Sequence, residues 1–495
     1  MKILEAKNIT KMFPGVVALD QVDVSFELGK ICCIVGENGA GKSTLIKILT
    51  GVYEPDEGSI TIQGENALKN KKIFGKVAYV PQELDLFRNM TVAENLFIPF
   101  SQSGGGACYF NRKALYQKAV PHLKKFQIRS DPDELVRNIS ISEQQLLQIA
   151  HATVNQYADI IMLDEPTTSL TLKDTERLFD ILNQLKREDK ALVFISHKLE
   201  EIFEIGDEIT IIRNGVKVAY SQVREANIPW VVKQMTGRDM DLNASFNPEK
   251  ISDEVLLEVE KLSGEQFANI SFKLNKGEIL GLSGLVGAGR SEIMQTIFGY
   301  RQAGGGAVKF DGKPLKLGDT HNSVKNGIVY ISEERKAHGI FPSLSVRKNI
   351  SMPLLDQIKN LFAVSSAKES KLVEKVIGEY QITVPSRETE VKFLSGGNQQ
   401  KVIIGRSMFL KPKLLIFDEP TKGIDVGTKM EIYKLMKRLV DEEDVSIILI
   451  SSELEELMKC SNRIITIYNG EKVDEFETAG AIKSDIVNSI IGIKN

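Results

Sequence analysis

Short runs of consecutive apolar residues, without polar alternation, recur at matching places in the two halves of the chain. Strands that helices cover on both faces have this flat apolar pattern, whereas half-exposed strands alternate. The pattern therefore predicts an α/β fold with a largely parallel sheet in each half. In chain order the predicted strands are 31–35, 160–163 and 192–195, then 279–283, 414–417 and 447–450.

A glycine-rich loop follows the first of these strands in each half. The first loop, Gly36 to Ser43, reads G-E-N-G-A-G-K-S and matches the phosphate-binding pattern G-x-x-x-x-G-K-[ST]. The second loop, Gly284 to Ser291, reads G-L-V-G-A-G-R-S, with Arg290 in place of the lysine. It lies about 250 residues after the first, a spacing too long for a solenoid unit, and this indicates a duplicated domain.

The duplication predicts a domain at 1–238, a linker at 239–254 and a second domain at 255–495. The predicted linker is mostly polar, and its apolar residues are scattered singly. The pattern becomes mixed and helical between 82 and 140, and again between 334 and 394. We interpret both stretches as helical insertions in the nucleotide-binding cores.

Composition and charge argue against several other classes of protein. A hydrophobic fraction of 42% and a charged fraction of 26% are ordinary for a globular protein. The net charge of −3 gives no basic field for nucleic acid. The 4 cysteines suit neither a disulfide scaffold nor a zinc site. The N-terminus lacks a signal-peptide core, and no apolar run reaches the roughly 18–20 residues of a membrane span. We therefore expect any membrane role to come through a partner.

The first glycine loop carries the side chains that bind a nucleotide triphosphate. Backbone N–H groups of such a loop point at phosphate oxygens. Lys42 would reach the β- and γ-phosphates, and the Ser43 hydroxyl would bind Mg²⁺. A chance match to the pattern is the alternative, and the apolar strand before the loop weakens it.

An acidic pair, Asp164 and Glu165, ends the predicted strand 160–163. Buried strands rarely end in carboxylates without a cation or substrate nearby. Asp164 suits the Mg²⁺ shell, and Glu165 suits a base that orients and polarises the attacking water. Two capping acids are the alternative, which Pro166-Thr167 directly after the pair and His197 after another apolar strand weaken.

With these residues the chain resembles the ABC-type ATPases over almost its whole length. The resemblance implies two P-loop ABC nucleotide-binding domains, each with a mostly parallel sheet core, an antiparallel β part and a helical subdomain. Gln82, in Y-V-P-Q, matches the family's glutamine, which contacts Mg²⁺ and the attacking water. His197, in I-S-H, matches the histidine that contacts the γ-phosphate, and Phe13 matches the aromatic that stacks on adenine. A structural histidine and an ordinary packing phenylalanine are the alternatives.

The segment Leu394 to Gln400, L-S-G-G-N-Q-Q, resembles the signature motif of this family. Its small residues and helix start can present N–H groups and a hydroxyl to an anion. The first half reads I-S-I-S-E at 139–143 and lacks both glycines. We expect Ile141 and Ser142 to crowd an approaching phosphate.

The second half keeps the acidic pair as Asp418 and Glu419, but it departs from the family pattern at Arg290, Glu333 and Ser452. A planar guanidinium does not replace a compact ammonium geometrically. Glu333 stands where the family has glutamine, and Ser452 where it has histidine.

The site residues that follow from motifs and resemblance divide by role. The expected catalytic residues are Gln82, Glu165 and His197, and the expected Mg²⁺ ligands are Ser43, Gln82 and Asp164. The expected ATP contacts of the first half are Phe13, Gly36, Glu37, Asn38, Gly39, Ala40, Gly41, Lys42, Ser43 and Thr44. Those of the second half are Gly287, Gly289, Arg290, Ser291, Ser395, Gly396, Gly397, Asn398 and Glu419.

In this family two nucleotide domains pack head to tail, with each ATP between the phosphate loop of one and the signature of the other. The intact loop at Lys42 would then face the intact signature at Ser395, and the altered loop at Arg290 would face Ser140. We expect one hydrolytic site and one degenerate site. The sequence leaves open whether the degenerate site binds nucleotide and whether the halves close within one chain or between chains.

The motifs most resemble those of ATPases from bacterial monosaccharide importers of the ribose, galactose and xylose type. These share L-S-G-G-N-Q-Q-K and D-E-P-T-K-G-I-D, found here at Leu394 to Lys401 and Asp418 to Asp425. The resemblance implies ATP and Mg²⁺, two membrane permease subunits and, through them, a soluble sugar-binding protein. It also implies a peripheral subunit on the cytoplasmic face of the cell membrane.

Two other classes of protein have similar motifs. A nucleoside or autoinducer-2 importer shares much of the set, and the solute is chosen by the binding protein and the permease. A soluble tandem-ABC translation factor resembles the chain less, because such proteins usually have a long charged helical segment between halves and two intact sites.

Overall fold

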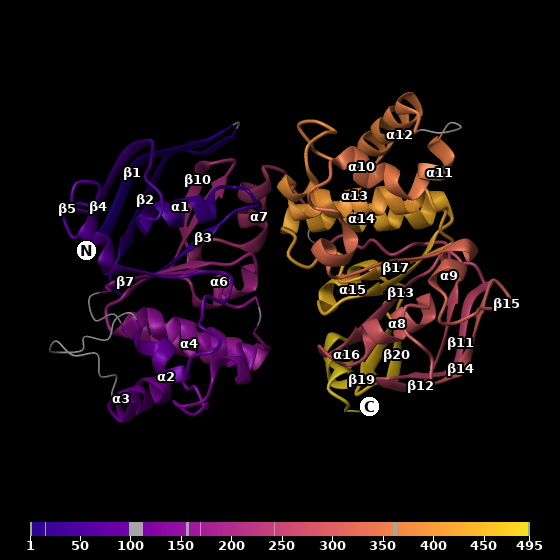
Figure 1. Cartoon of the computed structure of the whole chain (residues 1–495), viewed down its shortest axis with the longest axis horizontal. Coiled ribbons are helices and arrows are strands. Elements are labelled where there is room, and N and C mark those ends of the chain that lie inside the picture. The colour runs from indigo at the N-terminus through magenta and orange to yellow at the C-terminus, as the bar shows by residue number, and fades with distance from the viewer. Residues whose placement is uncertain are drawn as a thin grey trace. The chain divides into compact units, whose positions relative to one another are not determined.

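The chain divides into two compact units, Met1–Met240 and Asp241–Asn495 (Figure 1). The computed structural model describes residues 2–14, 16–98, 112–154, 158–168, 170–241, 243–359 and 364–493. Each unit holds a larger, mainly parallel sheet and a smaller antiparallel sheet. This confirms the predicted α/β class.

The larger sheet of the first unit has the strand order β10-β9-β3-β8-β7-β6. All neighbours are parallel except β10, which pairs antiparallel with β9. The strands β3, β7 and β8 are buried along their whole length, as their flat apolar sequences predict. The bounds are β3 (Ile31–Val35), β6 (Val77–Val80), β7 (Ile160–Asp164), β8 (Ala191–Ile195), β9 (Glu208–Arg213) and β10 (Val216–Gln222).

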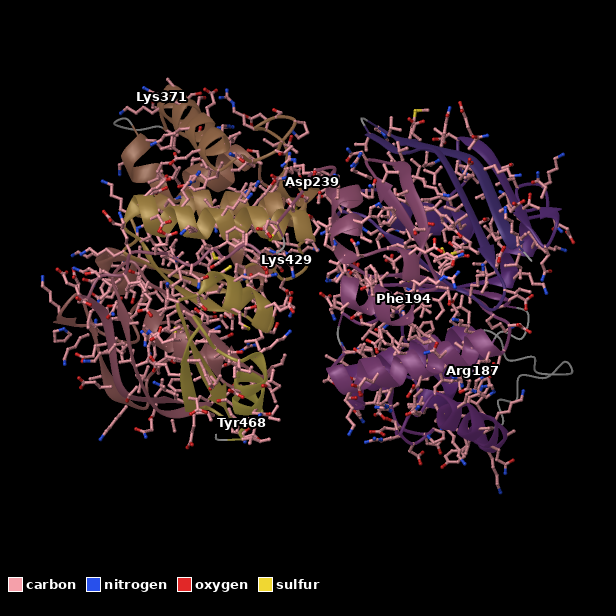
Figure 2. All side chains as sticks on the ribbon, turned by 180° about the vertical axis from the view of Figure 1, so that it is seen from behind. Arg187, Phe194, Asp239, Lys371, Lys429 and Tyr468 are labelled. Carbon is pink, nitrogen blue, oxygen red and sulfur yellow. The ribbon has the colours of Figure 1, made fainter. Side chains whose placement is uncertain are left out.

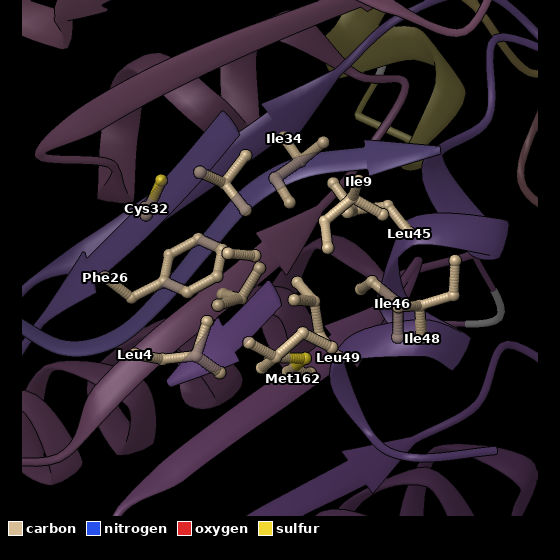
Figure 3. Packing of buried hydrophobic residues seen from close by; sticks show 14 of the residues in the cluster. Leu4, Ile9, Phe26, Cys32, Ile34, Leu45, Ile46, Ile48, Leu49 and Met162 are labelled. Carbon is tan, nitrogen blue, oxygen red and sulfur yellow. The ribbon is translucent and has the colours of Figure 1, made fainter. Parts of the chain in front are cut away.

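The smaller sheet of this unit has the order β2-β1-β4-β5 and is antiparallel. Its strands are β1 (Lys2–Phe13), β2 (Val16–Glu27), β4 (Glu57–Ile62) and β5 (Glu65–Asn66). Helix α1 (Lys42–Leu49) packs Leu45, Ile46 and Leu49 into the core that both sheets share (Figure 3). The helix that begins at the phosphate loop is therefore anchored by the main core of its unit.

The second unit repeats this plan. Its smaller sheet has the order β12-β11-β14-β15, and its larger sheet has the order β16-β17-β18-β13-β19-β20. The smaller sheet comprises β11 (Val255–Gly264), β12 (Phe267–Asn275), β14 (Gly305–Phe310) and β15 (Lys313–Pro314). The larger comprises β13 (Ile279–Gly284), β16 (Ile328–Ile331), β17 (Leu414–Asp418), β18 (Ser446–Ile450), β19 (Arg463–Tyr468) and β20 (Glu471–Glu477).

A group of helices lies apart from the smaller sheet in each unit (Figure 1). In the first unit it contains α2 (Val92–Phe97), α3 (Arg112–Lys125) and α4 (Ile141–Val154). In the second it contains α10 (Val346–Ser351), α11 (Leu355–Ile358), α12 (Ser366–Glu379) and α13 (Gly396–Met408). Helices α2 and α3, and α10 to α12, fall within the predicted helical insertions 82–140 and 334–394, whereas α4 and α13 begin just after those predicted ends.

The other helices connect or flank the sheet strands. In the first unit they are α5 (Leu172–Arg187), α6 (Leu199–Ile205) and α7 (Ile228–Thr236). Phe179 of α5 packs edge-on against Phe194 of β8, which is fully buried (Figure 2). In the second unit they are α8 (Arg290–Phe298), α9 (Thr320–Asn326), α14 (Val426–Glu443), α15 (Leu454–Cys460) and α16 (Lys483–Ile490).

The segment predicted as a linker, 239–254, packs against the second unit over its central part. Phe246 is buried, its ring centroid lies 5.7 Å from that of Tyr433, and its N–H donates to the carbonyl oxygen of Lys459. Asn462 Nδ2 donates to the carbonyl oxygen of Pro248 at 2.9 Å. One apolar residue within a polar segment gives no periodic signal, so the sequence did not indicate this docking.

Candidate functional site

The first phosphate loop runs from the end of β3 to the start of α1, and close approaches of its backbone require glycine. Gly41 has φ of 104°, in the left-handed region that glycine adopts readily. A Cβ on Gly36 would lie 2.2 Å from the carbonyl oxygen of Ile212. The expected phosphate contacts lie in the loop Gly36 to Gly41 and in the first helical residues, Lys42 to Thr44. The helix dipole favours an anion there.

Lys42, the first residue of α1, folds back over this loop. Its Nζ donates to the carbonyl oxygens of Gly36 at 2.8 Å and Glu37 at 2.9 Å. The residue is only 7% exposed. A charged phosphate oxygen is a stronger acceptor for an ammonium than a neutral carbonyl. Lys42 is therefore placed to exchange these carbonyls for phosphate oxygens.

The Ser43 hydroxyl lies close enough to the Asp164 carboxylate at the end of β7 to lower the pKa of that carboxyl. Burial raises the pKa of Asp164, while the hydrogen bond from Ser43 and the charge of Lys42 offset part of that rise. Mg²⁺ in phosphate sites takes one or two protein oxygens and completes its shell with phosphates and water. Ser43 and Asp164 fit this pattern. Among the residues that the structure describes, no group of three or more His, Cys, Asp or Glu could hold a metal ion by itself.

Glu165 contacts both of the other residues that are expected to be catalytic. Its Oε2 accepts a hydrogen bond from Gln82 Nε2 at 2.7 Å, and its Oε1 lies 3.3 Å from His197 Nδ1. Burial raises the pKa of Glu165, but the hydrogen bond and charge of His197 and the charge of Lys42 outweigh it and leave the pKa below its usual value. Gln82, also expected near Mg²⁺, here directs its amide N–H to Glu165.

Phe13, the expected adenine contact, lies at the end of β1 and is 38% exposed. Its ring centroid lies 5.7 Å from that of Tyr53 in an edge-to-face arrangement, and Lys11 Nζ lies 5.8 Å from the Phe13 centroid. The ring therefore combines a fixed neighbour with accessible surface. Such a ring can stack on a planar base.

In the second unit Arg290 occupies the place of Lys42, and its contacts are different. Its Nη1 donates to the carbonyl oxygen of Ser451 at 2.7 Å, and its Nη2 lies 3.3 Å from Glu419 Oε1. Both side chains of this ion pair are 8% exposed. The guanidinium thus bridges the acidic pair and the end of β18 rather than its own loop.

In the second unit the contact between the loop serine and the aspartate is retained, but the glutamine and histidine contacts of the glutamate are not. Ser291 Oγ donates to Asp418 Oδ1 at 3.0 Å, as Ser43 pairs with Asp164 in the first unit. Burial raises the pKa of Glu419, and Arg290 offsets part of the rise. Ser452 Oγ donates to Glu419 at 3.1 Å, while Glu333 pairs with Lys422 at 2.5 Å. The acidic pair is retained without the glutamine and histidine contacts.

The signature segment of the second unit forms the start of α13. Ser395 is the N-cap residue, and its Oγ accepts from the backbone N–H of Asn398 at 3.4 Å. A Cβ on Gly397 would lie 2.0 Å from Thr428 Cγ2, so the approach of α13 to α14 requires glycine there. Gly396 and Gly397 leave the first turn of α13 without side chains that could block an anion.

The corresponding segment of the first unit starts α4 with a different surface. Ile141 replaces the first glycine and is 57% exposed. Glu143 replaces the asparagine, and its carboxylate accepts from Ser130 Oγ and from the backbone N–H of Arg129. An apolar side chain and an acidic group therefore lie at the start of α4.

Arg335 is a contact that the motifs did not indicate. It belongs to a π-helical turn, Arg335–Gly339, just after Glu333 and Glu334. Its Nη1 donates to the carbonyl oxygen of Gly396 at 2.8 Å, and its Nη2 donates to that of Lys422 at 2.7 Å. Its charge and its position after the altered glutamine site were visible in the sequence, but its two carbonyl acceptors lie more than 60 residues away in the chain and need the fold.

Behind the second acidic pair lies Glu456 of α15, which is fully buried. Burial and the charge of Glu453 raise the pKa of Glu456 from its ordinary 4.5 to about 7, while hydrogen bonds from Ser451 and Thr421 and the charge of Lys429 oppose the rise. Between these two pH values the folded protein keeps a proton that the unfolded chain has lost. The contribution of Glu456 to stability therefore falls as the pH rises from 4.5 to about 7, and then levels off.

We predict that Glu456→Gln removes this pH dependence. The unfolding free energy of the unsubstituted protein should fall relative to that of the variant by about 1–3 kcal/mol between pH 5 and pH 8. Denaturant unfolding at both pH values measures the difference, and Glu249→Gln at an exposed site is the control. Parallel pH profiles for the unsubstituted protein and Glu456→Gln would contradict the prediction.

Comparison with known proteins identifies the family. The sequence profile of the ABC transporter family matches residues 19–168 and 267–422. The chain belongs to this family. This ABC protein is 40% identical to the galactose/methyl galactoside import ATP-binding protein of Clostridium perfringens (strain SM101 / Type A), over 94% of the chain and 91% of the relative.

Other relatives of this ABC protein are named for related sugars. It is 40% identical to the xylose import ATP-binding protein of Thermoanaerobacter pseudethanolicus, over 99% of each protein. It is 38% identical to the ribose import ATP-binding protein of Bacillus cereus, over 94% of the chain and 95% of the relative.

A solved structure also resembles this ABC protein over most of its length. The match is to a model of ribosome-bound archaeal Pelota and ABCE1, with a TM-score of 0.66, 18% identity, and coverage of 98% of this chain and 80% of that one. At this identity the likeness concerns the fold alone. Within the described residues, none of the helices has both the length and the apolarity needed to cross a bilayer.

Proposed function

We propose that this ABC protein is the ATP-hydrolysing subunit of a monosaccharide importer of the ribose, galactose or xylose type. Relatives named for these three sugars match it over nearly full length, which supports the solute class. The main support for ATP hydrolysis is that Gln82 and His197 both contact Glu165 in the first unit. The proposed partners are two permease subunits and, through them, a soluble sugar-binding protein, with this chain on the cytoplasmic face of the membrane.

The residues of the first unit divide the work of phosphoryl transfer to water. The loop N–H groups and Lys42 hold the phosphates, and Phe13 stacks on the adenine. Ser43 and Asp164 would hold Mg²⁺, which would neutralise charge on the phosphate oxygens. Glu165, ionised at neutral pH because its pKa is lowered, accepts a hydrogen bond from the attacking water. His197 and Gln82 fix the Glu165 carboxylate and face the reacting phosphate.

In the head-to-tail pairing of this family, the signature at the start of α13 would complete a hydrolytic site of this kind. Ser395 and the backbone N–H groups of the first turn of α13 are suited to contact the same phosphates, as in the head-to-tail pairing of this family. The altered loop at Arg290 would then pair with the segment at Ser140 and Ile141. In that arrangement the two unaltered motifs would form one site, and the two altered motifs would form the other.

The ion pair between Arg290 and Glu419 supports a degenerate second site. Arg290 already serves as donor to Glu419 and to the Ser451 carbonyl, so a phosphate would have to compete with both. Glu419 has a raised pKa and no histidine or glutamine at the positions that serve Glu165. We propose that this second site turns over nucleotide slowly or not at all.

A reconstitution experiment tests the transport function. The chain is incorporated into liposomes with the permease pair and binding protein encoded beside it, and uptake of radiolabelled ribose, galactose and xylose is measured with and without ATP. We expect ATP-dependent uptake of one of these sugars. Uptake only of a nucleoside or of autoinducer-2 would replace the solute class, and recovery of the chain with ribosomes rather than membranes would reject the importer.

Arg335 gives a further prediction about the hydrolytic site. Arg335→Ala removes two hydrogen bonds from a guanidinium to backbone carbonyls, one of them on Gly396. Hydrogen bonds to charged groups contribute about 1.5–3 kcal/mol each. We expect a loosened signature and a roughly tenfold or greater loss of steady-state ATPase activity. Arg335→Lys keeps the charge but cannot donate in two directions from one plane, and it should recover little.

The matched control for this prediction is Arg347→Ala. Arg347 lies on α10, in the helical group that also contains α13, and it pairs with Glu369 and Glu388 rather than with the signature. Equal ATPase losses in the two alanine variants would contradict a specific role of Arg335.

A further inference from the structure

A buried glutamate stands at the same place in both units, behind the acidic pair. Glu201 of α6 is 7% exposed and Glu456 of α15 is 1% exposed. Each lies four positions after the residue at the histidine site, which is His197 in the first unit and Ser452 in the second. Neither glutamate belongs to the site residues that the motifs indicate.

The carboxylate of Glu201 joins two turns that are distant in sequence. Its Oε2 accepts hydrogen bonds from Thr167 Oγ1 at 2.8 Å and from Ser196 Oγ at 2.7 Å. Its Oε1 lies 3.0 Å from Lys198 Nζ. Both hydroxyl donors are themselves buried. A buried carboxylate is costly unless its oxygens are satisfied, and here hydroxyl groups and an ammonium satisfy them.

The two joined turns are the ones that carry the reactive side chains. Thr167 follows Glu165 by two positions, and Ser196 directly precedes His197. The backbone N–H of Glu165 also donates to the carbonyl oxygen of Ile195 at 2.9 Å, which ties the same two turns at a second point. The Glu201 carboxylate therefore links the two turns whose side chains Glu165 and His197 lie 3.3 Å apart.

The second unit has the same bridge without the same reactive pair. Glu456 accepts hydrogen bonds from Thr421 Oγ1 at 2.8 Å and from Ser451 Oγ. The backbone N–H of Glu419 donates to the carbonyl oxygen of Ile450 at 2.9 Å. The turns joined here carry Glu419 and Ser452. The chain therefore contains two structurally matched bridges, of which only the first supports a glutamate–histidine contact.

We propose that Glu201 is a positioning residue for ATP hydrolysis, which holds the Glu165 and His197 turns at their contact distance. This inference rests on the proposed function of the first unit as the hydrolytic site. Glu201 touches neither nucleotide nor metal ligand in this role. It acts through Thr167 and Ser196, so its loss should lower the rate of the chemical step and leave nucleotide binding nearly unchanged.

The side-chain chemistry separates a positioning role from a need for negative charge. In Glu201→Gln an amide oxygen at the place of Oε2 can still accept from both Thr167 and Ser196, and the amide NH₂ group takes the place of Oε1 beside Lys198. That variant keeps the bridge and loses only the ion pair with Lys198. Glu201→Ala loses both hydrogen bonds and leaves two buried hydroxyl groups without this partner.

The experiment compares steady-state ATP hydrolysis and thermal unfolding of the full chain for Glu201→Ala, Glu201→Gln, Thr167→Val, Glu456→Ala and Glu165→Gln. For Glu201→Ala we expect kcat to fall about 10–100-fold, the usual effect of removing a residue that orients a site ligand. Its KM for ATP should stay within about threefold, because the phosphate loop is untouched. Glu201→Gln should stay within about fivefold of the unsubstituted kcat. Glu456→Ala, the matched control, should lower the unfolding temperature similarly without a comparable fall in kcat.

The outcomes separate this inference from the proposed function. If Glu201→Ala and Glu456→Ala lose kcat equally, or if Glu201→Ala keeps full kcat, the positioning role is rejected while a loss in Glu165→Gln still supports the hydrolytic site. If Glu165→Gln keeps full activity, the proposed function itself fails. If Glu201→Ala does not fold, Thr167→Val decides, since it removes one arm of the bridge: a lowered kcat with unchanged KM supports the role, and an unchanged kcat rejects it.

Discussion

We expect Glu165→Gln to lower ATP hydrolysis by about 10²–10⁴-fold, the usual scale for loss of a general base, and Glu419→Gln to have a much smaller effect. Glu165 has a lowered pKa, Gln82 and His197 as partners, and Lys42 close enough to stabilise its charge. Glu419 has a raised pKa and is held by Arg290 and Ser452. The same substitution thus removes a polarising carboxylate in one unit and one partner of a buried ion pair in the other.

Steady-state kcat for the two purified variants, measured at saturating ATP and Mg²⁺, checks this result. Unfolding temperatures provide the control, because a folding defect would lower activity without regard to chemistry. Equal losses of kcat in two well-folded variants would reject the asymmetry between the sites.

The second large effect separates Lys42 from Arg290. Lys42→Ala removes an ammonium whose partners are backbone carbonyls of its own loop and which is placed to meet phosphate. Loss of one charged partner from a buried pair costs about 2–5 kcal/mol, so we expect at least a 30-fold loss of kcat/KM for ATP. Stability should change less than in Arg290→Ala, because Lys42 donates to two backbone carbonyls whereas Arg290 forms a buried ion pair.

Arg290→Ala should give the opposite result. It leaves Glu419 buried without its ion-pair partner, and we expect the unfolding free energy to fall by about 3 kcal/mol while ATPase activity stays close to normal. Arg290→Lys, which keeps a positive charge, should restore part of the lost stability. Denaturant unfolding and steady-state kinetics on the three variants measure both quantities. A large ATPase loss in Arg290→Ala without loss of stability would contradict this assignment.

Elements that depend on local pattern were predictable from the sequence. The flat apolar runs gave the buried strands β3, β7 and β8 nearly to their ends, because a parallel strand covered on both faces has few polar positions. The course of the phosphate loop followed from its glycines, since their spacing reflects close backbone approach. The duplication of the domain followed from the repeated order of the motifs.

Contacts made across the fold were not predictable in the same way. The Arg290–Glu419 ion pair joins α8 to the end of β17, and the Arg335 contacts join a π-helical turn to the start of α13. Such pairs depend on which elements become neighbours, and residue type alone allows many partners for an arginine. The packing of Phe246 against the second unit also depends on which elements become neighbours in the fold. The Glu201 and Glu456 bridges could have been suspected by comparing the two copies, because a glutamate recurs at the same offset in both.

A single-turnover measurement can show whether the two sites differ in chemistry. The assembled transporter is loaded with ATP in the absence of Mg²⁺, Mg²⁺ is added, and the phosphate formed in the first turnover is quantified per chain after rapid quenching. We expect one phosphate per chain in the fast phase, from the site built on Lys42 and Glu165. Two phosphates per chain, formed at the same rate, would contradict it.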